Sequence, residues 1–552
     1  ARPIASQSIA RQVLGNAPDW PNVTYAFVDM KNFKRYLDFN NYVTEILDTP
    51  ICERGVPSKE LPIDCSEDAL TPLVLANKVN EYDSDYIIIP HGQTWGLYTP
   101  KGYTLDKGLE LSKQYPNQFD LLEIHSGHGN SEEYRSWRAG KVTRESEVIV
   151  DTMINVRDVT ELNFQTGTLI ATVDGKERSF DFGTQVCPEP AENYTPQCWK
   201  LGEIIYERCI KAGENDKECE ERKIKTQQIV VDRGRTGINA ISNLTERDKL
   251  DSGQCRDCFS PAMNYVPGGS AQYGMALTKF KDDGSKHRFK YGFISSSDNH
   301  QAAPGSGYKE LFHTSVDGVG PPKELFDKFL HMKPYTIGAK NENPVKDAYI
   351  SDDQPIDFDL TKLTLGFNTI EWERQRSFFQ TGGLAAVHSE GRSKEEIWDA
   401  FKRHETYATS GPRILLWFDL VNNQDSKNGK SPMGSLVEMN QNPEFEVRAM
   451  GSYVQKSGCP EDAYTALGED RVNELCYNEC YNPSDERKKI TRIEVIRVWP
   501  QEYINQPIDE RIEDTWLVHN CDTDELGCRF NFTDPDFSTM QSDVSYYARA
   551  IE

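Results

Sequence analysis

An alternation of short apolar segments with helical segments over the first two-thirds of the chain constrains the fold more than any other feature. Segment 68–82 has helical spacing and an acidic start, and it leads into the apolar segment 85–90, which we expect to be a strand. The same order returns with an expected helix at 105–114, a strand at 119–125 and a helix at 131–137 that Ser131 would cap. Such a βα rhythm predicts a mainly parallel sheet or an α/β barrel.

Residues from about 150 to 270 interrupt this rhythm, and we interpret them as an elaborated, cysteine-bearing insertion. Segments 168–173 and 178–182 alternate in the manner of a β-hairpin around Asp174-Gly175. Segment 201–212 is an expected helix. The βα rhythm resumes with an expected strand at 290–296, which is followed by a loop.

The residue pattern changes after about residue 412, where helical patterns become scarce. Four segments there have strand patterns and are separated by loops rich in Pro, Gly and Asn: 414–420, 444–450, 490–498 and 544–551. We therefore predict an α/β domain over residues 1–411 and a C-terminal, antiparallel β-sandwich-like domain over 412–552. Because the chain stops directly after a strand pattern, we expect the natural protein to continue further.

The acidic character of the chain limits its partners. It carries 62 Lys and Arg against 87 Asp and Glu, a formal net charge of −25. A field of that sign repels phosphate backbones, so we expect no nucleic-acid partner, and its simplest role is solubility. No apolar run approaches the roughly 20 residues of a membrane helix, so no transmembrane segment is expected.

Thirteen cysteines are many for a cytosolic enzyme, and their spacing is local. Four neighbouring pairs stand in polar sequence, and five further cysteines follow late in the chain: Cys52 with Cys65, Cys187 with Cys198, Cys209 with Cys219, Cys255 with Cys258, then Cys459, Cys476, Cys480, Cys521 and Cys528. This pattern indicates disulfides and a periplasmic or extracellular location, although the connectivity stays open.

Histidines and acidic residues follow three predicted strands. His91 ends the first strand, Glu123 and His125 end the second, and Asp298 and His300 follow the third. In barrels, functional residues lie where strands end and loops begin. Carboxylate and imidazole groups are what a catalytic divalent metal ion requires, and the ion would activate water. These clusters predict a metal site.

Plainer interpretations exist for individual residues. A single histidine after a strand is most often a hydrogen-bonded structural residue, and His128 lies between glycines that suit a turn. The pair Cys255 and Cys258 has no second CxxC to complete a zinc site, which favours a disulfide or loop staple.

The same segments carry a resemblance to a known superfamily. The runs 89–91, 123–125, 127–132 and 296–300 resemble motifs of PHP-type proteins, a superfamily named for polymerase and histidinol phosphatase domains. The runs 251–258, 406–413 and 476–485 are similar to a large branch of secreted bacterial proteins labelled as a domain of unknown function. The resemblance extends over nearly the whole chain from about residue 80.

The resemblance implies a distorted, PHP-like (TIM-type) barrel that holds one to three Mn, Zn or Fe ions. It implies hydrolysis, often of phosphate esters and in some relatives of carbamate or amide bonds. By position, His91 matches a mid-barrel histidine, Glu123 and His125 match a later acidic and histidine strand end, and Asp298 with His300 matches the final Asp-x-His pair. The H-x-H and D-H ligand motifs that open the family are absent here, which we attribute to a missing N-terminal segment.

The sequence thus predicts a secreted metal-dependent hydrolase acting on a small-molecule phosphoester, with amide, carbamate or ester substrates as the alternative. We expect His91, Asp298 and His300 to bind the metal and Glu123 and His125 to act as ligand or proton-transfer groups. Arg233 or Arg235 would bind an anionic substrate. Two non-catalytic alternatives are a degenerate barrel that binds or supports extracellular partners, and a carbohydrate-binding C-terminal domain.

Overall fold

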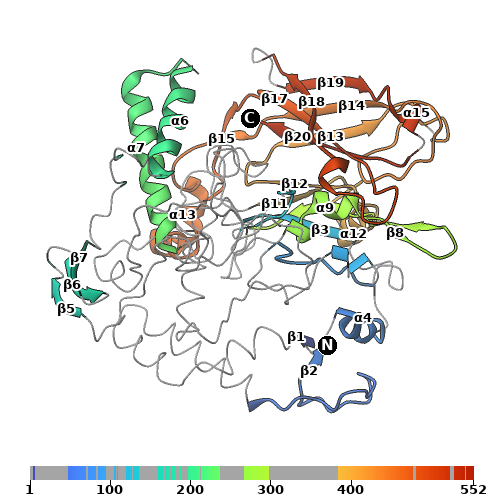
Figure 1. The fold of residues 1–552 in the computed structure, drawn as a ribbon, viewed down its shortest axis with the longest axis horizontal. Helices are drawn as coiled ribbons and strands as arrows, with labels where there is room; N and C mark the ends of the chain where they lie inside the picture. Colours follow the sequence, from blue (N-terminus) through green and yellow to red (C-terminus); the bar gives the residue numbers. More distant parts are fainter. Residues whose placement is uncertain are drawn as a thin grey trace.

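The structure is a computed structural model (Figure 1). It describes the following ranges: 4–6, 48–69, 72–82, 85–94, 105–106, 108–109, 120–126, 129–135, 159–163, 165, 168–173, 176–181, 187, 190, 197–211, 213–236, 267–297, 383–426, 428–476, 480–522, 527–540 and 542–552.

The first elements form a small unit near the N-terminus. A short parallel pair is made by β1 (Ile4–Ser6) and β2 (Glu67–Ala69), followed by α4 (Pro72–Asn80). The helix confirms the central part of the helix expected over 68–82, but its expected acidic start, Asp68, lies in β2 instead. Segment 85–90 is not a strand, because it contains only one isolated bridge residue, at Ile88. Its apolar run was too short to separate a strand from an irregular segment, and Ile89 is exposed.

A three-stranded sheet brings together segments that lie far apart in the sequence. Strand β3 (Leu121–Ser126) is central, with β10 (Gly292–Ser295) parallel to it on one side and β4 (Gly129–Asn130) antiparallel on the other. All six residues of β3 are buried. A strand covered on both faces needs an apolar run, and Leu121, Leu122 and Ile124 supply it. Both predicted strands are confirmed, and their carboxyl ends meet at one edge.

The expected helix over 131–137 is not formed in its described part, where residues 132 and 133 make a bend and the others are irregular. The backbone N–H of Ser131 donates instead to the carbonyl of Ile124 at 2.7 Å, and the Ser131 hydroxyl bonds that of Thr94 at 2.8 Å. The Ser131 carbonyl accepts the N–H of Ala271, the first residue of helix α9 (Ala271–Ala276). Tertiary partners therefore replace the predicted helix cap.

The elements after β10 extend this region. The antiparallel pair β11 (Leu384–Val387) and β12 (Thr406–Thr409) is connected through α12 (Lys394–Lys402). Ser393 and Glu396 form a capping box at the start of α12, which fixes where the helix begins. The N–H of Gly383 donates to the carbonyl of Ser296 at 2.6 Å, so β11 starts directly beside the end of β10.

The described part of the predicted insertion holds a β-meander and a helical hairpin. The meander is β5 (Val159–Asn163), β6 (Thr168–Val173) and β7 (Lys176–Asp181), which confirms the predicted β-hairpin. Helices α6 (Gln197–Lys211) and α7 (Asp216–Thr236) stand side by side in Figure 1. The disulfide Cys209–Cys219 joins them next to their connection.

Two three-stranded antiparallel sheets make up the C-terminal region, drawn in orange and red in Figure 1. One has the order β13-β14-β19 and the other β18-β17-β20: β13 (Leu415–Leu420), β14 (Glu444–Met450), β17 (Arg492–Val498), β18 (Ile512–Asn520), β19 (Gly527–Thr533) and β20 (Ser545–Ile551). The four predicted strands coincide with β13, β14, β17 and β20. Val447 and Phe532 from one sheet and Ile493 and Val495 from the other belong to one buried core.

A second core connects the C-terminal sheets to the βα region. Leu105, Leu109 and Ala276 pack with Ile496 and Val498 of β17. The remaining short elements lie around these layers: η4 (Pro267–Gly269), β8 (Lys279–Phe280), β9 (Lys286–His287), β15 (Tyr453–Gln455), α13 (Glu461–Leu467), α14 (Glu469–Cys476), β16 (Pro483–Arg487), η6 (Asp509–Arg511) and α15 (Phe537–Met540). Helices α13 and α14 were not expected from the sequence.

The described disulfides are local, as the cysteine spacing indicated. They join Cys52 to Cys65, Cys209 to Cys219, Cys459 to Cys480 and Cys521 to Cys528. The first two match neighbouring pairs picked out in the sequence. The pair Cys255 and Cys258 lies outside the described residues.

The described strands form no closed barrel, so the barrel and the domain boundary at 411–412 remain predictions. Among the helices within the described ranges, none is long and apolar enough to cross a membrane.

The shared core gives a stability prediction. Ile493 is fully buried in β17, whereas Val518 on the adjacent strand β18 is 52% exposed. We expect Ile493→Ala to lower the free energy of unfolding by roughly 2–5 kcal/mol, because it removes buried methyl groups and leaves a cavity. Val518→Ala should cost less than about 1 kcal/mol. Urea denaturation followed by tryptophan fluorescence measures both, and equal costs would contradict the shared core.

Candidate functional site

The carboxyl ends of β3 and β10 bring three predicted segments together. Glu123 of β3 is 9% exposed, and its Oε2 lies 2.5 Å from Nδ1 of His91. Its other oxygen, Oε1, accepts a hydrogen bond from the hydroxyl of Ser296, directly after β10. The Ser296 N–H donates to the carbonyl of His125 at 3.0 Å. The structure therefore brings His91 and Glu123 into contact, as expected for a common site.

His91 is the solvent-facing member of this group. Its side chain is 57% exposed, whereas that of Glu123 is 8% exposed. A buried carboxylate that accepts the Nδ1 proton of an imidazole fixes the tautomer in which Nε2 is unprotonated, the form in which histidines bind metal ions.

His125 lies two residues after Glu123 in β3 and is buried, at 5% exposure. Its Nε2 lies 3.6 Å from Oε2 of Glu132. Its Nδ1 has no hydrogen-bond partner among the described residues. Burial lowers the pKa of His125 below its usual value, and the charge of Arg549 reinforces this shift. The charges of Glu132 and Glu123 and a backbone contact with Ile124 oppose it. The imidazole is therefore neutral near pH 7, with a nitrogen able to accept a proton.

Glu132 is held by side chains from the other end of the chain. Its Oε1 accepts hydrogen bonds from Nε of Arg549 at 2.5 Å and from the hydroxyl of Tyr547 at 2.9 Å. Its own N–H donates to Oδ1 of Asn130 at 2.7 Å. Both donors to the carboxylate lie on β20, so the C-terminal sheet reaches the edge of the β3 sheet.

Arg549 is the centre of a buried charged group, which we call the Arg549 cluster. Its guanidinium contacts four carboxylates: Glu132, Glu133, Glu494 and Asp514. The contact with Asp514 is bidentate, at 2.7 and 2.8 Å. Gln272 completes the group, because its amide donates to Asp514 at 2.9 Å and to the Tyr547 hydroxyl at 2.8 Å.

The cluster changes the acidity of its members in opposite directions. Burial raises the pKa of Glu133 to about 6, although Arg549 and Arg135 oppose the shift. The pKa of Asp514 is instead well below its usual range, because the bidentate guanidinium of Arg549 outweighs burial. Asp514 is thus a strong counter-charge of Arg549, and the carboxyl group of Glu133 binds a proton at higher pH than that of Asp514.

The other predicted site residues are not placed. Asp298, His300 and His128 lie outside the described residues, and the described chain reaches Ser297, one residue before Asp298. Arg233 and Arg235 fall in α7, for which only the backbone is described at these positions. Sequence reasoning missed Glu132, Ser296, Tyr547 and Arg549 as members of the site. Glu132 and Ser296 stood in motifs already singled out, whereas nothing near Arg549 in the sequence pointed to the site.

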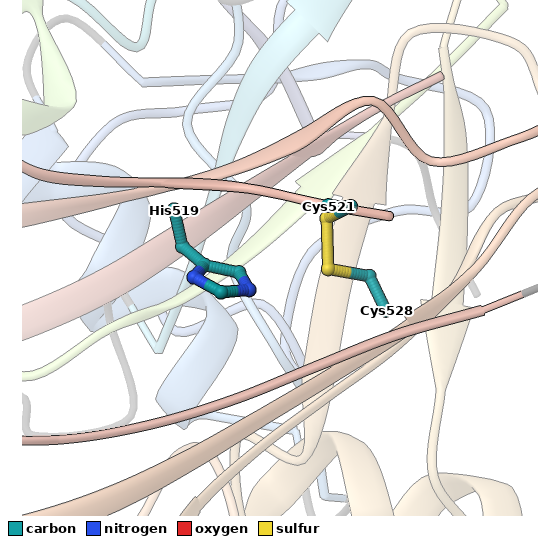
Figure 2. A group of neighbouring side chains, drawn as sticks. All are labelled: His519, Cys521 and Cys528. Atoms are coloured by element: carbon teal, nitrogen blue, oxygen red, sulfur yellow. A yellow bond between two sulfur atoms is a disulfide. The ribbon is translucent and has the colours of Figure 1, made fainter. Parts of the chain in front are cut away.

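A second group has the composition of a metal site but not its chemistry. His519, Cys521 and Cys528 have their ligand atoms within 4.8 Å of one another, the one such group of three found in the described ranges. Figure 2 shows that the two sulfur atoms are bonded to each other, beside the ring of His519. Disulfide sulfurs are not thiolates and do not bind zinc as thiolates do. His519 stacks on Phe530, with ring centroids 4.3 Å apart.

The raised pKa of Glu133 predicts a pH dependence of stability. The native carboxyl group binds a proton more tightly than the unfolded one between its usual pKa of 4.5 and about 6. Stability from this group is therefore present at low pH and is lost as the pH rises through 6. Relative to Glu133→Gln, the wild type should lose roughly 1–2 kcal/mol of unfolding free energy between pH 4.5 and pH 7.5.

Urea denaturation of both proteins at several pH values measures this difference. Glu486→Gln, at an exposed position of β16, is the control and should show no such trend. A difference between wild type and Glu133→Gln that does not vary with pH would contradict the raised pKa.

Comparison with known protein families gives a match over part of the chain. A family described as "Protein of unknown function (DUF3604)" matches residues 257–460, less than half of the chain. The matched segment contains β10, Ser296 and the run 406–413, but neither β3 nor β20. No curated protein and no solved structure matches the chain. The segment is thus similar to a family of unknown function, in agreement with that part of the resemblance seen in the sequence.

Proposed function

We propose that this protein is a secreted metal-dependent hydrolase whose site lies at the carboxyl ends of β3 and β10, with a phosphoester as substrate. The observation that supports it most directly is the buried Nδ1 of His125, which lacks a hydrogen-bond partner within the described part of the chain. Unsatisfied buried polar groups are rare and call for a functional explanation. His125 lies two residues from Glu123, which binds His91 and Ser296.

The donor set at this edge fits a divalent cation in part. His91 supplies an imidazole whose Nδ1 is held by Glu123, and Asp298 with His300 would supply a carboxylate and a further imidazole from the loop after β10. Nitrogen and oxygen donors of this kind suit Mn, Zn or Fe. His91, Glu123 and His125 do not by themselves bring three ligand atoms together, so the proposal depends on Asp298 and His300.

When bound, such an ion supplies Lewis acidity toward a phosphoryl oxygen and acidifies a water molecule. Hydrolysis joins the oxygen of water to phosphorus and breaks the bond from phosphorus to the ester oxygen. The water loses one proton and the departing alcohol gains one, so a proton acceptor is needed.

His125 is suited to accept that proton at Nδ1. Its Nε2 faces the carboxylate of Glu132. This carboxylate would stabilise the imidazolium that forms, as the carboxylate beside a catalytic histidine does in other hydrolases. Its lowered pKa keeps it unprotonated before the reaction near pH 7. Glu123 has a different role, because both of its oxygens already hold His91 and Ser296 in position.

Secretion into an oxidising compartment is supported by the disulfides. Four are present in the described ranges, in both the N-terminal and C-terminal parts of the chain. Stable disulfides of this number are typical of periplasmic and extracellular proteins.

Metal content and hydrolysis test the proposal together. We expect the purified protein to contain at least one equivalent of Mn, Zn or Fe and to hydrolyse bis(p-nitrophenyl) phosphate. His91→Ala should lose bound metal. His125→Ala should retain metal and lower kcat about 100-fold or more, because it removes the proton acceptor.

His404→Asn is the matched control. Nε2 of His404 lies 4.0 Å from Oδ1 of Asp120, which directly precedes β3 at the end opposite the site. The backbone of His404 has a positive φ of 59°, which asparagine tolerates. This variant should keep its metal and its activity. Hydrolysis of p-nitrophenyl acetate or a carbamate in place of phosphoesters would favour the alternative substrates. A protein that neither contains nor takes up metal would favour a non-catalytic binding role.

A further inference from the structure

We infer that β20, the final strand of the chain, is part of the site: Arg549 and Tyr547 hold Glu132 opposite His125, and Glu132 keeps the proton of His125 on Nε2. The inference rests on the proposed function in one respect only, namely that Nδ1 of His125 accepts a proton during hydrolysis. Arg549 and Tyr547 are positioning residues, since they act through Glu132.

The two oxygens of Glu132 have separate partners. Arg549 and Tyr547 both donate to Oε1, at 2.5 and 2.9 Å. Oε2 lies 3.6 Å from Nε2 of His125, a charge contact slightly longer than a hydrogen bond. The donors on Oε1 therefore fix the plane of the carboxylate, and Oε2 is directed at the imidazole.

A carboxylate in this position selects one tautomer of a neutral histidine. An ionised carboxylate only accepts hydrogen bonds, so the favourable arrangement has the proton on Nε2 and the lone pair on Nδ1. The lone pair then lies on the nitrogen without a partner in the described ranges. The opposite tautomer would bring two lone pairs together in a buried place.

The surroundings of Glu132 hold its carboxylate in place. Its side chain is 2% exposed, and that of Arg549 is 8% exposed. Asp514 and Gln272 in turn hold Arg549 and Tyr547. Because these partners come from β18, α9 and β20, the geometry at His125 depends on the C-terminal sheet being docked.

Adjacent tyrosines of β20 offer a matched pair of variants. Tyr547 donates to Glu132 at 2.9 Å, and Tyr546 donates to Asp534 at 2.6 Å, away from the site. Tyr547→Phe and Tyr546→Phe each remove one hydroxyl–carboxylate hydrogen bond and keep the ring. Tyr547→Phe also removes the hydroxyl that accepts hydrogen bonds from Gln272 and Arg549. Both are conservative enough to fold, which a change of Arg549 is not.

Long-range ¹H–¹⁵N spectra of the ¹⁵N-histidine-labelled, metal-free protein at pH 7.5 report the tautomer, with His125→Gln assigning the signal. We expect His125 to carry its proton on Nε2 in the wild type and in Tyr546→Phe. Tyr547→Phe should raise the population of the Nδ1–H tautomer. With bis(p-nitrophenyl) phosphate, Tyr547→Phe should lower kcat about tenfold with KM unchanged, and Tyr546→Phe should stay within about twofold of wild type.

A wild-type proton on Nδ1, or identical His125 spectra in Tyr547→Phe and Tyr546→Phe, would overturn the inference. Absence of hydrolysis in all three proteins would overturn the proposed function instead, and the tautomer comparison would still decide the role of β20.

Discussion

The buried guanidinium of Arg549 is the interaction on which the arrangement of this protein depends. It carries one positive charge among four carboxylates that come from the loop after β4, from β17 and from β18. Each of these charges would be costly to bury without a partner. Separating the C-terminal sheets from the β3 sheet would leave Glu132 and Glu133 without Arg549. The cluster therefore specifies how the two parts fit, whatever its net effect on stability.

Because the Arg549 cluster joins the β3 sheet to the C-terminal sheet, the candidate site has residues from both. The parallel pair β3 and β10 supplies the edge at which Glu123, His125 and Ser296 lie. The C-terminal sheet supplies Tyr547 and Arg549, which set the position of Glu132. A β-rich domain attached to a hydrolase is often regarded as a separate binding module. Here its last strand contributes to the immediate surroundings of a predicted catalytic histidine.

Local patterns in the sequence predicted many of the longer described strands, but not β18 or β19. Segment 444–450 alternates apolar and polar residues and forms β14 with the same bounds, and 121–125 is apolar enough to be a buried central strand. Predictions went wrong where tertiary contacts replaced local preferences. Ser131 has a typical N-cap side chain, but its hydroxyl bonds Thr94 and its backbone bonds Ile124. A single sequence does not contain the information for that choice.

In the candidate site, too, local patterns identified some residues and missed those that only tertiary contacts bring in. His91, Glu123 and His125 could be selected because acidic and imidazole groups at strand ends suggest metal chemistry. Glu132 and Arg549 could not be paired, because 416 intervening residues separate them and a buried guanidinium has no sequence signature of its own. Asp298, His300 and the barrel itself remain predictions.

The most direct test of the central claim is a crystal of the protein soaked in Mn²⁺, with data collected at the manganese absorption edge. The proposal predicts an anomalous peak within bonding distance of His91, at the edge formed by the ends of β3 and β10. An ordered edge with no peak, or a peak confined to the surface acidic residues, would contradict the assignment of this edge as a metal-dependent hydrolase site.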